Sequence, residues 1–414
     1  MKTHREILEI LSGLLVAMFV ANVSATIVAN ALPVITAHLG TAQRQYTWIV
    51  TATMLAQTAS TPIWGKLADL FDKKKLLLVA IGLFSVGSLC AGAAANTGQL
   101  IAFRALQGLA MGAMLILIQT IIGTVIPPRQ RGRYMAYTGA VIAVATVAGP
   151  LIGGFIVDTS WLGWRWCFWA AIPFALAAMV VLQWRLEVPP TRRRAPGESA
   201  GIDWLGATLI TAAASDLLIW ISFADHSFAW VSWQTGVMLG STALLTVLFI
   251  LVERKATNPI IPLPIIRERN TALAVIASIA VGVGMFGSAV FLGQYYQVAR
   301  GYSPTAAGLM MVPMMAGVLI ASVVVGRWIS HVGVWKPFVV VGTLVLAGGS
   351  ALMGTIGYST SLVTIAIYGA ICGLGVGMTM QNLVLAVQNS VPRRDVGAAT
   401  ASVNFFRTLG GTIG

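Results

Sequence analysis

The chain contains a long series of apolar stretches, most of them about 20 residues long, separated by short breaks of charged residues, Pro or Gly. A helix needs about 20 mainly apolar residues to cross the hydrocarbon core of a membrane. Only 9% of the residues are charged, whereas a soluble domain carries about 25%. So few charges cannot cover a water-facing surface, which excludes a soluble enzyme or nucleic-acid-binding protein. We therefore expect an all-α membrane protein embedded in the lipid bilayer.

Thirteen stretches fit this description, and the last one runs to the end of the printed sequence. Their approximate bounds are 10–33, 46–68, 75–95, 99–125, 134–157, 165–186, 204–224, 233–252, 271–297, 304–328, 337–357, 361–388 and 396–414.

The basic residues support this division of the chain. Alternate loops, counted from the N-terminus, hold 21 of the 26 Lys and Arg residues, and the opposite loops hold only three. Cytoplasmic loops of membrane proteins carry such an excess of Lys and Arg. We therefore predict a multi-pass protein of the plasma (inner) membrane with a cytoplasmic N-terminus. The net charge of +13 is then a property of loops and does not indicate a nucleic-acid partner.

The first stretch has an alternative interpretation as a cleaved signal peptide. Lys2 and Arg5 precede the apolar run, and residues 29–31 resemble a small-residue cleavage site. Glu6 and Glu9 interrupt the basic leader, which favours a membrane span.

The sequence also contains an internal repeat. The segment 108–112 recurs as 373–377, and Gly132 recurs as Gly397, both at an offset of 265 residues. Gly65-Lys66 has a weaker echo in Gly326-Arg327, at an offset of 261. Two halves with related helices are typical of secondary transporters.

This repeat defines the expected domains. Residues 1–190 would form an N-terminal six-helix bundle, residues 191–260 a linker with an inserted helix pair, and residues 261–414 a C-terminal bundle. The C-terminal bundle would need a fourteenth helix, so we expect a truncated end at which the last helix is missing.

The loop after the second stretch carries a first motif, Gly65-Lys66-Leu67-Ala68-Asp69-Leu70-Phe71-Asp72-Lys73-Lys74-Lys75. Gly65 would allow two helices to approach closely, and Asp69 could cap a helix N-terminus and pair with basic residues. The loop resembles the G-x-L-A-D-x-x-G-R-K-x loop of the major facilitator superfamily. It departs from that pattern at Asp72 and Lys73, and the alternative is an ordinary basic loop.

The fourth stretch carries Arg104-Ala105-Leu106-Gln107-Gly108, which resembles the R-x-x-Q-G motif of the same family. A guanidinium inside a bilayer costs several kcal/mol and persists where it faces a cavity or a partner. Arg104, Gln107 and Gly108 are therefore candidates for conformational coupling. The alternative is an arginine whose charge reaches the membrane surface.

The fifth stretch ends in Gly149-Pro150-Leu151-Ile152-Gly153-Gly154, which resembles the G-P-x-x-G-G motif of antiporters. Pro bends a helix, and Gly leaves a smooth face. We expect Gly149, Pro150, Gly153 and Gly154 to pack closely against the other bundle. The alternative is that they are ordinary helix-packing residues.

Together these motifs resemble the fourteen-span drug:proton antiporter branch of the superfamily, which includes multidrug and quaternary-ammonium efflux proteins. The resemblance implies two six-helix bundles with an inserted helix pair. It also implies a secondary active exporter that moves lipophilic drugs or toxic compounds by proton antiport with alternating access. Such a protein is not an enzyme, needs no cofactor or metal, and is expected to work as a monomer. Its partners would be lipid, protons and a small lipophilic substrate.

One departure concerns proton coupling. The family commonly has an acid at the position that is Ser24 here. Proton coupling usually needs a carboxylate whose pKa is raised by desolvation. Asp216 is the only acid well within a predicted span, so it is the candidate proton site, with a helix-packing contact or a water-exposed position as the alternatives.

The expected substrate cavity is apolar with scattered polar groups, as suits a bulky amphiphile. Asn22, Thr26 and Asn30 are spaced by four and share one helix face. The other candidates, which could instead form interhelical hydrogen bonds, are Ser24, Gln119, Gln294, Tyr295 and Gln381.

Two further functions stay open. The protein could be a dedicated exporter of one endogenous metabolite, lipid or antibiotic. Ser24 in place of the usual acid also allows a non-coupled facilitator or a ligand-sensing receptor.

Overall fold

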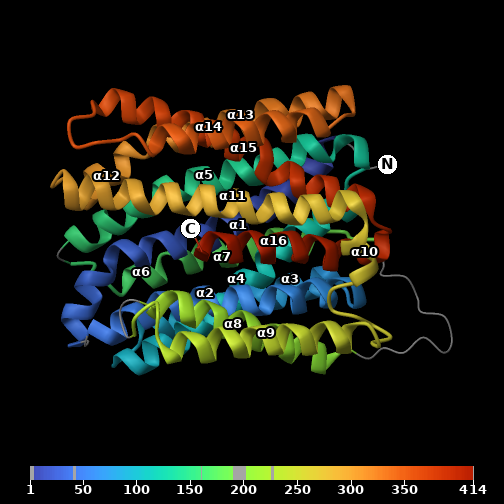
Figure 1. Cartoon of the computed structure of the whole chain (residues 1–414), viewed down its shortest axis with the longest axis horizontal. Helices are drawn as coiled ribbons and strands as arrows, with labels where there is room; N and C mark the ends of the chain where they lie inside the picture. Colours follow the sequence, from blue (N-terminus) through green and yellow to red (C-terminus); the bar gives the residue numbers. More distant parts are fainter. Residues whose placement is uncertain (1–3, 41–42, 160, 190–201, 225–227, 414) are drawn as a thin grey trace.

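A computed structural model describes residues 4–40, 43–159, 161–189, 202–224 and 228–413. This part of the chain is a bundle of long helices that lie roughly side by side (Figure 1).

Three groups of helices follow one another along the chain. The N-terminal half consists of α1 (His4–Leu39), α2 (Gln43–Leu70), α3 (Lys73–Gly92), α4 (Thr97–Val125), α5 (Pro128–Asp158), α6 (Trp166–Trp169) and α7 (Ala171–Arg185). Two helices follow, α8 (Trp204–Phe223) and α9 (Trp233–Glu253). The C-terminal half consists of α10 (Leu263–Arg267), α11 (Arg269–Gln294) with a π-helical extension (Tyr295–Ala299), α12 (Pro304–Met310), α13 (Val312–Val332), α14 (Lys336–Met353), α15 (Leu362–Ser390), a short 3-10 helix (Arg393–Asp395) and α16 (Val396–Ile413).

Eleven helices of the described residues are long and apolar enough to cross a membrane, and each coincides with a predicted span. The other two predicted spans, 46–68 and 396–414, correspond to α2 and α16. The low hydropathy of α2 has a physical reason, because many of its hydroxyl side chains are buried against other helices and do not face lipid. These buried residues are Thr51, Thr53, Thr58, Ser60 and Thr61.

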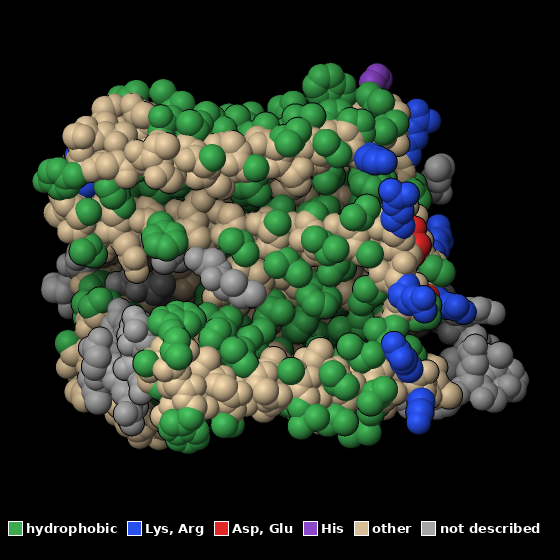
Figure 2. Space-filling view, viewed as in Figure 1, with side chains coloured by type: hydrophobic (Ala, Val, Ile, Leu, Met, Phe, Trp, Pro, Cys, Tyr) green, Lys and Arg blue, Asp and Glu red, His purple; other side chains and the backbone are tan. Residues whose placement is uncertain are grey.

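Lys and Arg side chains gather at one end of the bundle (Figure 2), the end at which α10 and the N-terminus lie (Figure 1). We call it the basic end. Asp72 starts α3 at this end, because its side chain accepts hydrogen bonds from the N–H groups of Lys74 and Lys75. The gathering of basic loops at one end is what the charge pattern predicts, and the side of the membrane on which that end lies stays a prediction.

The sequence repeat is also a repeat in packing. A β-carbon placed on Gly108 of α4 would lie 2.3 Å from the carbonyl oxygen of Thr53 in α2. A β-carbon placed on Gly373 of α15 would lie 1.9 Å from the carbonyl oxygen of Met314 in α13. Both glycines are needed for backbone-to-backbone contact. Helix α15 therefore packs on α13 as α4 packs on α2.

Helices α8 and α9 pack against each other, and α8 also packs against α2. Thr211 of α8 donates a hydrogen bond to the carbonyl oxygen of Ala59 in α2, at 3.2 Å. Helix α9 exposes many large apolar side chains, among them Val237 and Leu244, as expected of a helix that faces lipid.

Candidate functional site

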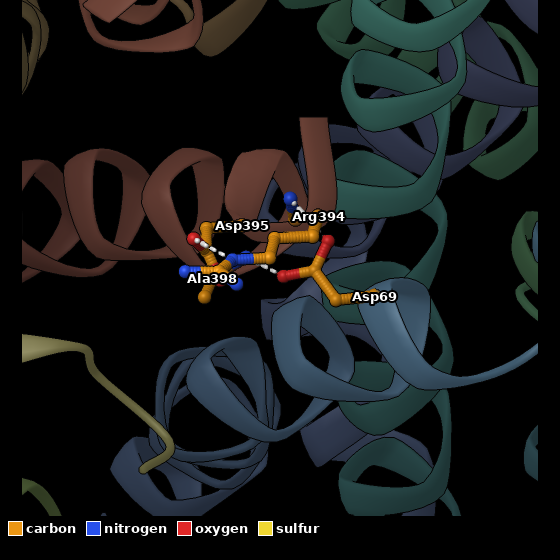
Figure 3. Close-up of polar contacts among 5 residues, drawn as sticks. Asp69, Arg394, Asp395 and Ala398 are labelled. Carbon is orange, nitrogen blue, oxygen red and sulfur yellow. Dashed lines mark hydrogen bonds and ion pairs between the residues drawn. The ribbon is translucent and has the colours of Figure 1, made fainter. Parts of the chain in front are cut away.

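The two halves meet at the basic end, and Asp69 of α2 makes a direct polar contact between them (Figure 3). Its Oδ1 accepts a hydrogen bond from the N–H of Gly397 at 2.7 Å, and its Oδ2 accepts one from the N–H of Ala398 at 2.8 Å. These donors belong to the first turn of α16, where free N–H groups and the helix dipole favour an anion. Asp69 thus caps a helix N-terminus, as the sequence predicts, but that helix belongs to the other half.

The surroundings of Asp69 also affect its proton. The residue lies beyond the predicted span 46–68, and its side chain is partly buried. Burial raises the pKa of Asp69 to about 7, because the ionised carboxylate loses hydration, and the two N–H donors and Lys73 only partly oppose this rise.

Gly65, one turn before Asp69, lies where α2 packs tightly against α16. A β-carbon placed on Gly65 would lie 2.3 Å from Cβ of Ala401 and 2.8 Å from the carbonyl oxygen of Gly397. A larger residue would push the two helices apart and separate Asp69 from its donors.

A second contact of the same kind joins α13 to α5. A β-carbon placed on Gly326 would lie 2.4 Å from Cβ of Ala136 and 2.6 Å from the carbonyl oxygen of Gly132. Ser330 Oγ accepts a hydrogen bond from the N–H of Arg133 at 2.7 Å, in the first turns of α5. Gly326 and Ser330 lie 261 positions after Gly65 and Asp69, so this contact is the repeat-related counterpart of the first.

Arg131 makes a third contact across the halves. It is 3% exposed and donates to the carbonyl oxygen of Ile126 at 3.0 Å, to that of Gln388 at 3.3 Å and to Asn389 Oδ1 at 2.7 Å. Sequence reasoning counted Arg131 as a loop charge and missed this role, as it missed that of Ser330. The offsets of the repeat could have pointed to Ser330.

A buried polar network lies deeper along the same interface. Gln119 Oε1 of α4 accepts a hydrogen bond from Asn404 Nδ2 of α16 at 2.7 Å. Gln388 Nε2 of α15 donates to the carbonyl oxygen of Gln119 at 3.1 Å and to Thr400 Oγ1 at 2.9 Å. Gln119, predicted as a cavity residue, therefore ties the two halves together here.

Arg104 lies inside the N-terminal half. Its side chain is 2% exposed, and it donates from Nη1 to Gln107 Oε1 at 3.0 Å. Gln107 Nε2 in turn donates to Ser88 Oγ of α3 at 2.8 Å. The interpretation of Arg104 as a residue that reaches the surface is wrong, because packing of α3 against α4 encloses it.

The glycines of the α5 motif face α1 in their own half. A β-carbon on Gly149 would lie 1.8 Å from Thr26 Oγ1, and one on Gly153 would lie 3.0 Å from the carbonyl oxygen of Ile27. The prediction that these two glycines pack against the other half is therefore wrong. Pro150 does approach the other half, since a β-carbon on Gly308 of α12 would lie 3.2 Å from Cβ of Pro150. Gly154 lies half-buried on the same helix.

The polar residues predicted on α1 mostly bond within the helix. Asn22 Nδ2 donates to the carbonyl oxygen of Met18 at 2.8 Å. Thr26 Oγ1 lies within 3.3 Å of the carbonyl oxygens of Asn22, Val23 and Ala145. Ser24 is fully buried, and its hydroxyl has no hydrogen-bond partner among the described residues. The side chain of Asn30 lies outside the part that the structure describes.

A cavity of about 410 Å³ lies between α11 and α14. Its lining residues are Ser288, Phe291, Leu292, Tyr295, Ser350, Met353, Gly354 and Ile356. Tyr295 is the one predicted cavity residue in this lining. Gln294 is exposed, and Gln381 is buried on α15. This cavity therefore includes one of the chosen polar residues, and a substrate cavity shared by the others stays a prediction.

Asp216 lies between α8 and α9. It accepts hydrogen bonds from Thr242 Oγ1 at 2.9 Å and from Ser241 Oγ. This is the helix-packing contact that the sequence offered as the alternative to a proton site. Within the described ranges, no cluster of three or more His, Cys, Asp or Glu residues could hold a metal ion.

Comparisons with known proteins agree with this architecture. The model of the Major Facilitator Superfamily matches residues 14–414. The chain is 35% identical over 409 residues to the multidrug transporter protein MdtP of Bacillus subtilis (strain 168). These matched residues are 98% of this chain and 73% of MdtP. The chain is 34% identical over 400 residues to the efflux pump dotC of Dothistroma septosporum. These matched residues are 96% of this chain and 68% of dotC.

The chain spans 58% to 77% of the length of eight curated relatives that it matches. Among solved structures, the proton:xylose symporter XylE shares the fold, with a TM-score of 0.70 and 14% identity over 99% of this chain and 87% of that one. The chain therefore belongs to the major facilitator superfamily, a family of multi-pass membrane transporters of small substrates that are not enzymes.

Proposed function

We propose that this protein exports small lipophilic compounds across the plasma membrane by alternating access, with proton antiport as the energy source. Relatives that are named multidrug transporter and efflux pump support export. The motifs at Gly65 to Lys75, Arg104 to Gly108 and Gly149 to Gly154 support the fourteen-span drug:proton antiporter branch. The basic end would then face the cytoplasm, in line with the positive-inside rule.

The observation that carries the proposal is the closed basic end. Asp69, Ser330 and Arg131 each join the two halves there, and the repeat relates the first two contacts. Rocking of one half against the other would break all three. With the basic end on the cytoplasmic side, the described conformation would be the outward-facing state, in which the cytoplasmic side is closed.

Helices α8 and α9 would be the inserted pair of this branch. Helix α15 repeats α4, so the helices of the C-terminal half are counted from α11, and α8 and α9 belong to neither half. The exposed apolar face of α9 suits a peripheral position in lipid.

The coupling of protons is tested through Asp216 and Arg104. We would measure transport in inverted vesicles with an imposed pH gradient, using a dye-like cation and a neutral lipophile. The wild type is compared with Asp216→Asn and with the control Asp72→Asn, which changes an exposed carboxylate that caps α3. Loss of transport in Asp216→Asn alone would make Asp216 the proton site.

Three other transport results would lead to different conclusions. Transport that survives in Asp216→Asn but not in Arg104→Ala would place coupling at Arg104. Transport that ignores the pH gradient would contradict proton antiport and favour a facilitator. Transport of one compound out of a broad panel would favour a dedicated exporter.

A further inference from the structure

Arg407 is a buried cation of the C-terminal half, one hydrogen bond away from a contact between the two halves. It lies in the middle of α16, and its side chain is 4% exposed. Its guanidinium donates to Asn404 Oδ1 and, at 3.4 Å, to the carbonyl oxygen of Met380. Both acceptors are neutral, and no carboxylate of the described residues forms an ion pair with Arg407.

The charge of Arg407 is compensated by neutral acceptors alone among the described residues. A guanidinium removed from water is strongly disfavoured unless an anion or several acceptors compensate it. The sequence offers no such anion nearby, because Asp216 is the only acid well within a predicted span, and it bonds to Ser241 and Thr242 of α9.

An unused hydrogen-bond donor lies in the same network. Asn404 links Arg407 to Gln119, and Gln119 Nε2 is buried with no acceptor among the described residues. Buried polar groups are normally paired, so Arg407, Asn404 and Gln119 together hold one positive charge and one donor that no described residue satisfies.

We propose that Arg407, Asn404 and Gln119 form a binding site for the acidic group of a lipophilic organic anion, with carboxylates as the substrate class. A guanidinium and amide N–H groups are the donors that bind carboxylate oxygens. The same charge repels cations. The inference rests on the proposed export function and specifies its substrate.

An anionic substrate also adds a driving force to the proposed proton antiport. The membrane potential, negative inside, favours outward movement of an anion. A potential of 100 mV corresponds to about a 50-fold concentration ratio for one charge. The potential and the proton gradient would therefore both drive the export of a lipophilic anion.

The contact between Gln119 and Asn404 gives the anion a way to act on the conformation. This hydrogen bond joins the halves, and Asn404 also accepts from Arg407. A carboxylate that takes the donors of Arg407 and Asn404 would replace part of this bond, so binding would favour separation of the halves at this level.

The experiment uses three dansyl probes with the same alkyl chain, which end in a carboxylate, a trimethylammonium group or a methyl ester. Transport is measured in inverted vesicles with an imposed membrane potential and, separately, with a pH gradient. The variants are Arg407→Gln, which removes the charge, and Arg407→Lys, which keeps it. Arg327→Gln is the matched control, because Arg327 is exposed at the basic end.

We expect the wild type to move the carboxylate probe faster than the trimethylammonium probe, and we expect both the potential and the pH gradient to drive this transport. Arg407→Gln should raise the KM for the carboxylate by about tenfold or more, since a charged hydrogen bond is lost. It should leave the KM for the methyl ester probe unchanged. Arg407→Lys should recover part of the affinity, and Arg327→Gln should resemble the wild type.

Three results would overturn the inference. The first is faster wild-type transport of the ammonium probe than of the carboxylate, which would leave the export function intact and needs no variant. The second is an equal loss for all probes in Arg407→Gln, which would indicate a purely structural role. The third is tight binding of the carboxylate probe to the purified protein that Arg407→Gln does not weaken.

Binding to the purified protein also separates the two proposals. If no probe moves in vesicles but the carboxylate probe binds in an Arg407-dependent manner, the anion site stands and the export function is wrong.

Discussion

Closure of the basic end should take up a proton at Asp69. In the closed state burial raises the pKa of Asp69 to about 7. When the halves separate, the carboxylate is hydrated and its pKa returns to about 3.9. The closed state therefore binds the proton more tightly than the open state, so lowering the pH between about 7 and 4 favours closure. At pH above 7 both states are ionised and this contribution is absent.

The size of the effect follows from the same two pKa values. Below pH 7, each pH unit adds about 1.4 kcal/mol to the closed state until the open state also takes up the proton. Between pH 8 and pH 5 the closed state should gain about 2 to 3 kcal/mol, which is close to a hundredfold change in the ratio of closed to open molecules. The sign is opposite to that expected if the attraction between the ionised carboxylate and the N-terminus of α16 outweighed desolvation.

The assay is a distance measurement by electron paramagnetic resonance. Spin labels at Arg129→Cys and Arg327→Cys report the separation of α5 and α13 at the basic end, after the three native cysteines have been replaced. The fraction of closed molecules is measured from pH 5 to pH 8. Asp69→Asn is neutral throughout this range and should remove the pH dependence, whereas Asp72→Asn should keep it.

Two results would refute the reasoning. A closed fraction that rises with pH would mean that the ionised form of Asp69 stabilises the closed state. A pH dependence that persists in Asp69→Asn would place the titrating group elsewhere.

Three more predictions concern packing and the other contacts between the halves. Gly373→Ala should destabilise the protein by about 1 to 3 kcal/mol in thermal unfolding, because the new β-carbon would clash with the backbone of Met314. The control Gly82→Ala should be neutral or stabilising, because a β-carbon there has no neighbour within 4 Å. Ser330→Ala removes one neutral hydrogen bond and should destabilise the closed state relative to the open state by about 1 kcal/mol. The pH dependence should not change, and the same spin-label assay measures both. Arg131→Gln loses charged bonds to the other half and should cost the closed state about 1.5 to 3 kcal/mol; an unchanged label distance would contradict the role given to Arg131.

The helices could be predicted from the sequence because hydrophobicity in a membrane is a local property. Each apolar stretch must form its own backbone hydrogen bonds in lipid, so every predicted span corresponds to helix. Asp69 could be predicted at a helix N-terminus for a similar reason, since a loop acid bounded by basic residues has few other favourable positions. The sequence did not reveal that the helix would be α16.

Side-chain direction was harder to predict, because it depends on which helices become neighbours. Gly149 and Gly153 were expected to face the other half, but they face α1, since a small residue accepts any close neighbour. Asn22 and Thr26 do share a helix face, yet they bond mainly to their own backbone, which a polar side chain in an apolar environment can always do. Periodicity places such residues on a face and does not determine their partners.

The internal repeat separates packing from chemistry. The glycines that allow backbone contact recur in both halves, as at Gly65 and Gly326, because the close approach of helices is needed twice. Two ionisable residues do not recur: Asp69 has Ser330 as its counterpart, and Arg407 corresponds to Ile142, 265 positions earlier. Two equal halves could rock symmetrically with no preference for a substrate charge or for a pH. We infer that the ionisable residues that break the repeat, Asp69 and Arg407, give the two-fold scaffold its response to protons and its selectivity for charge.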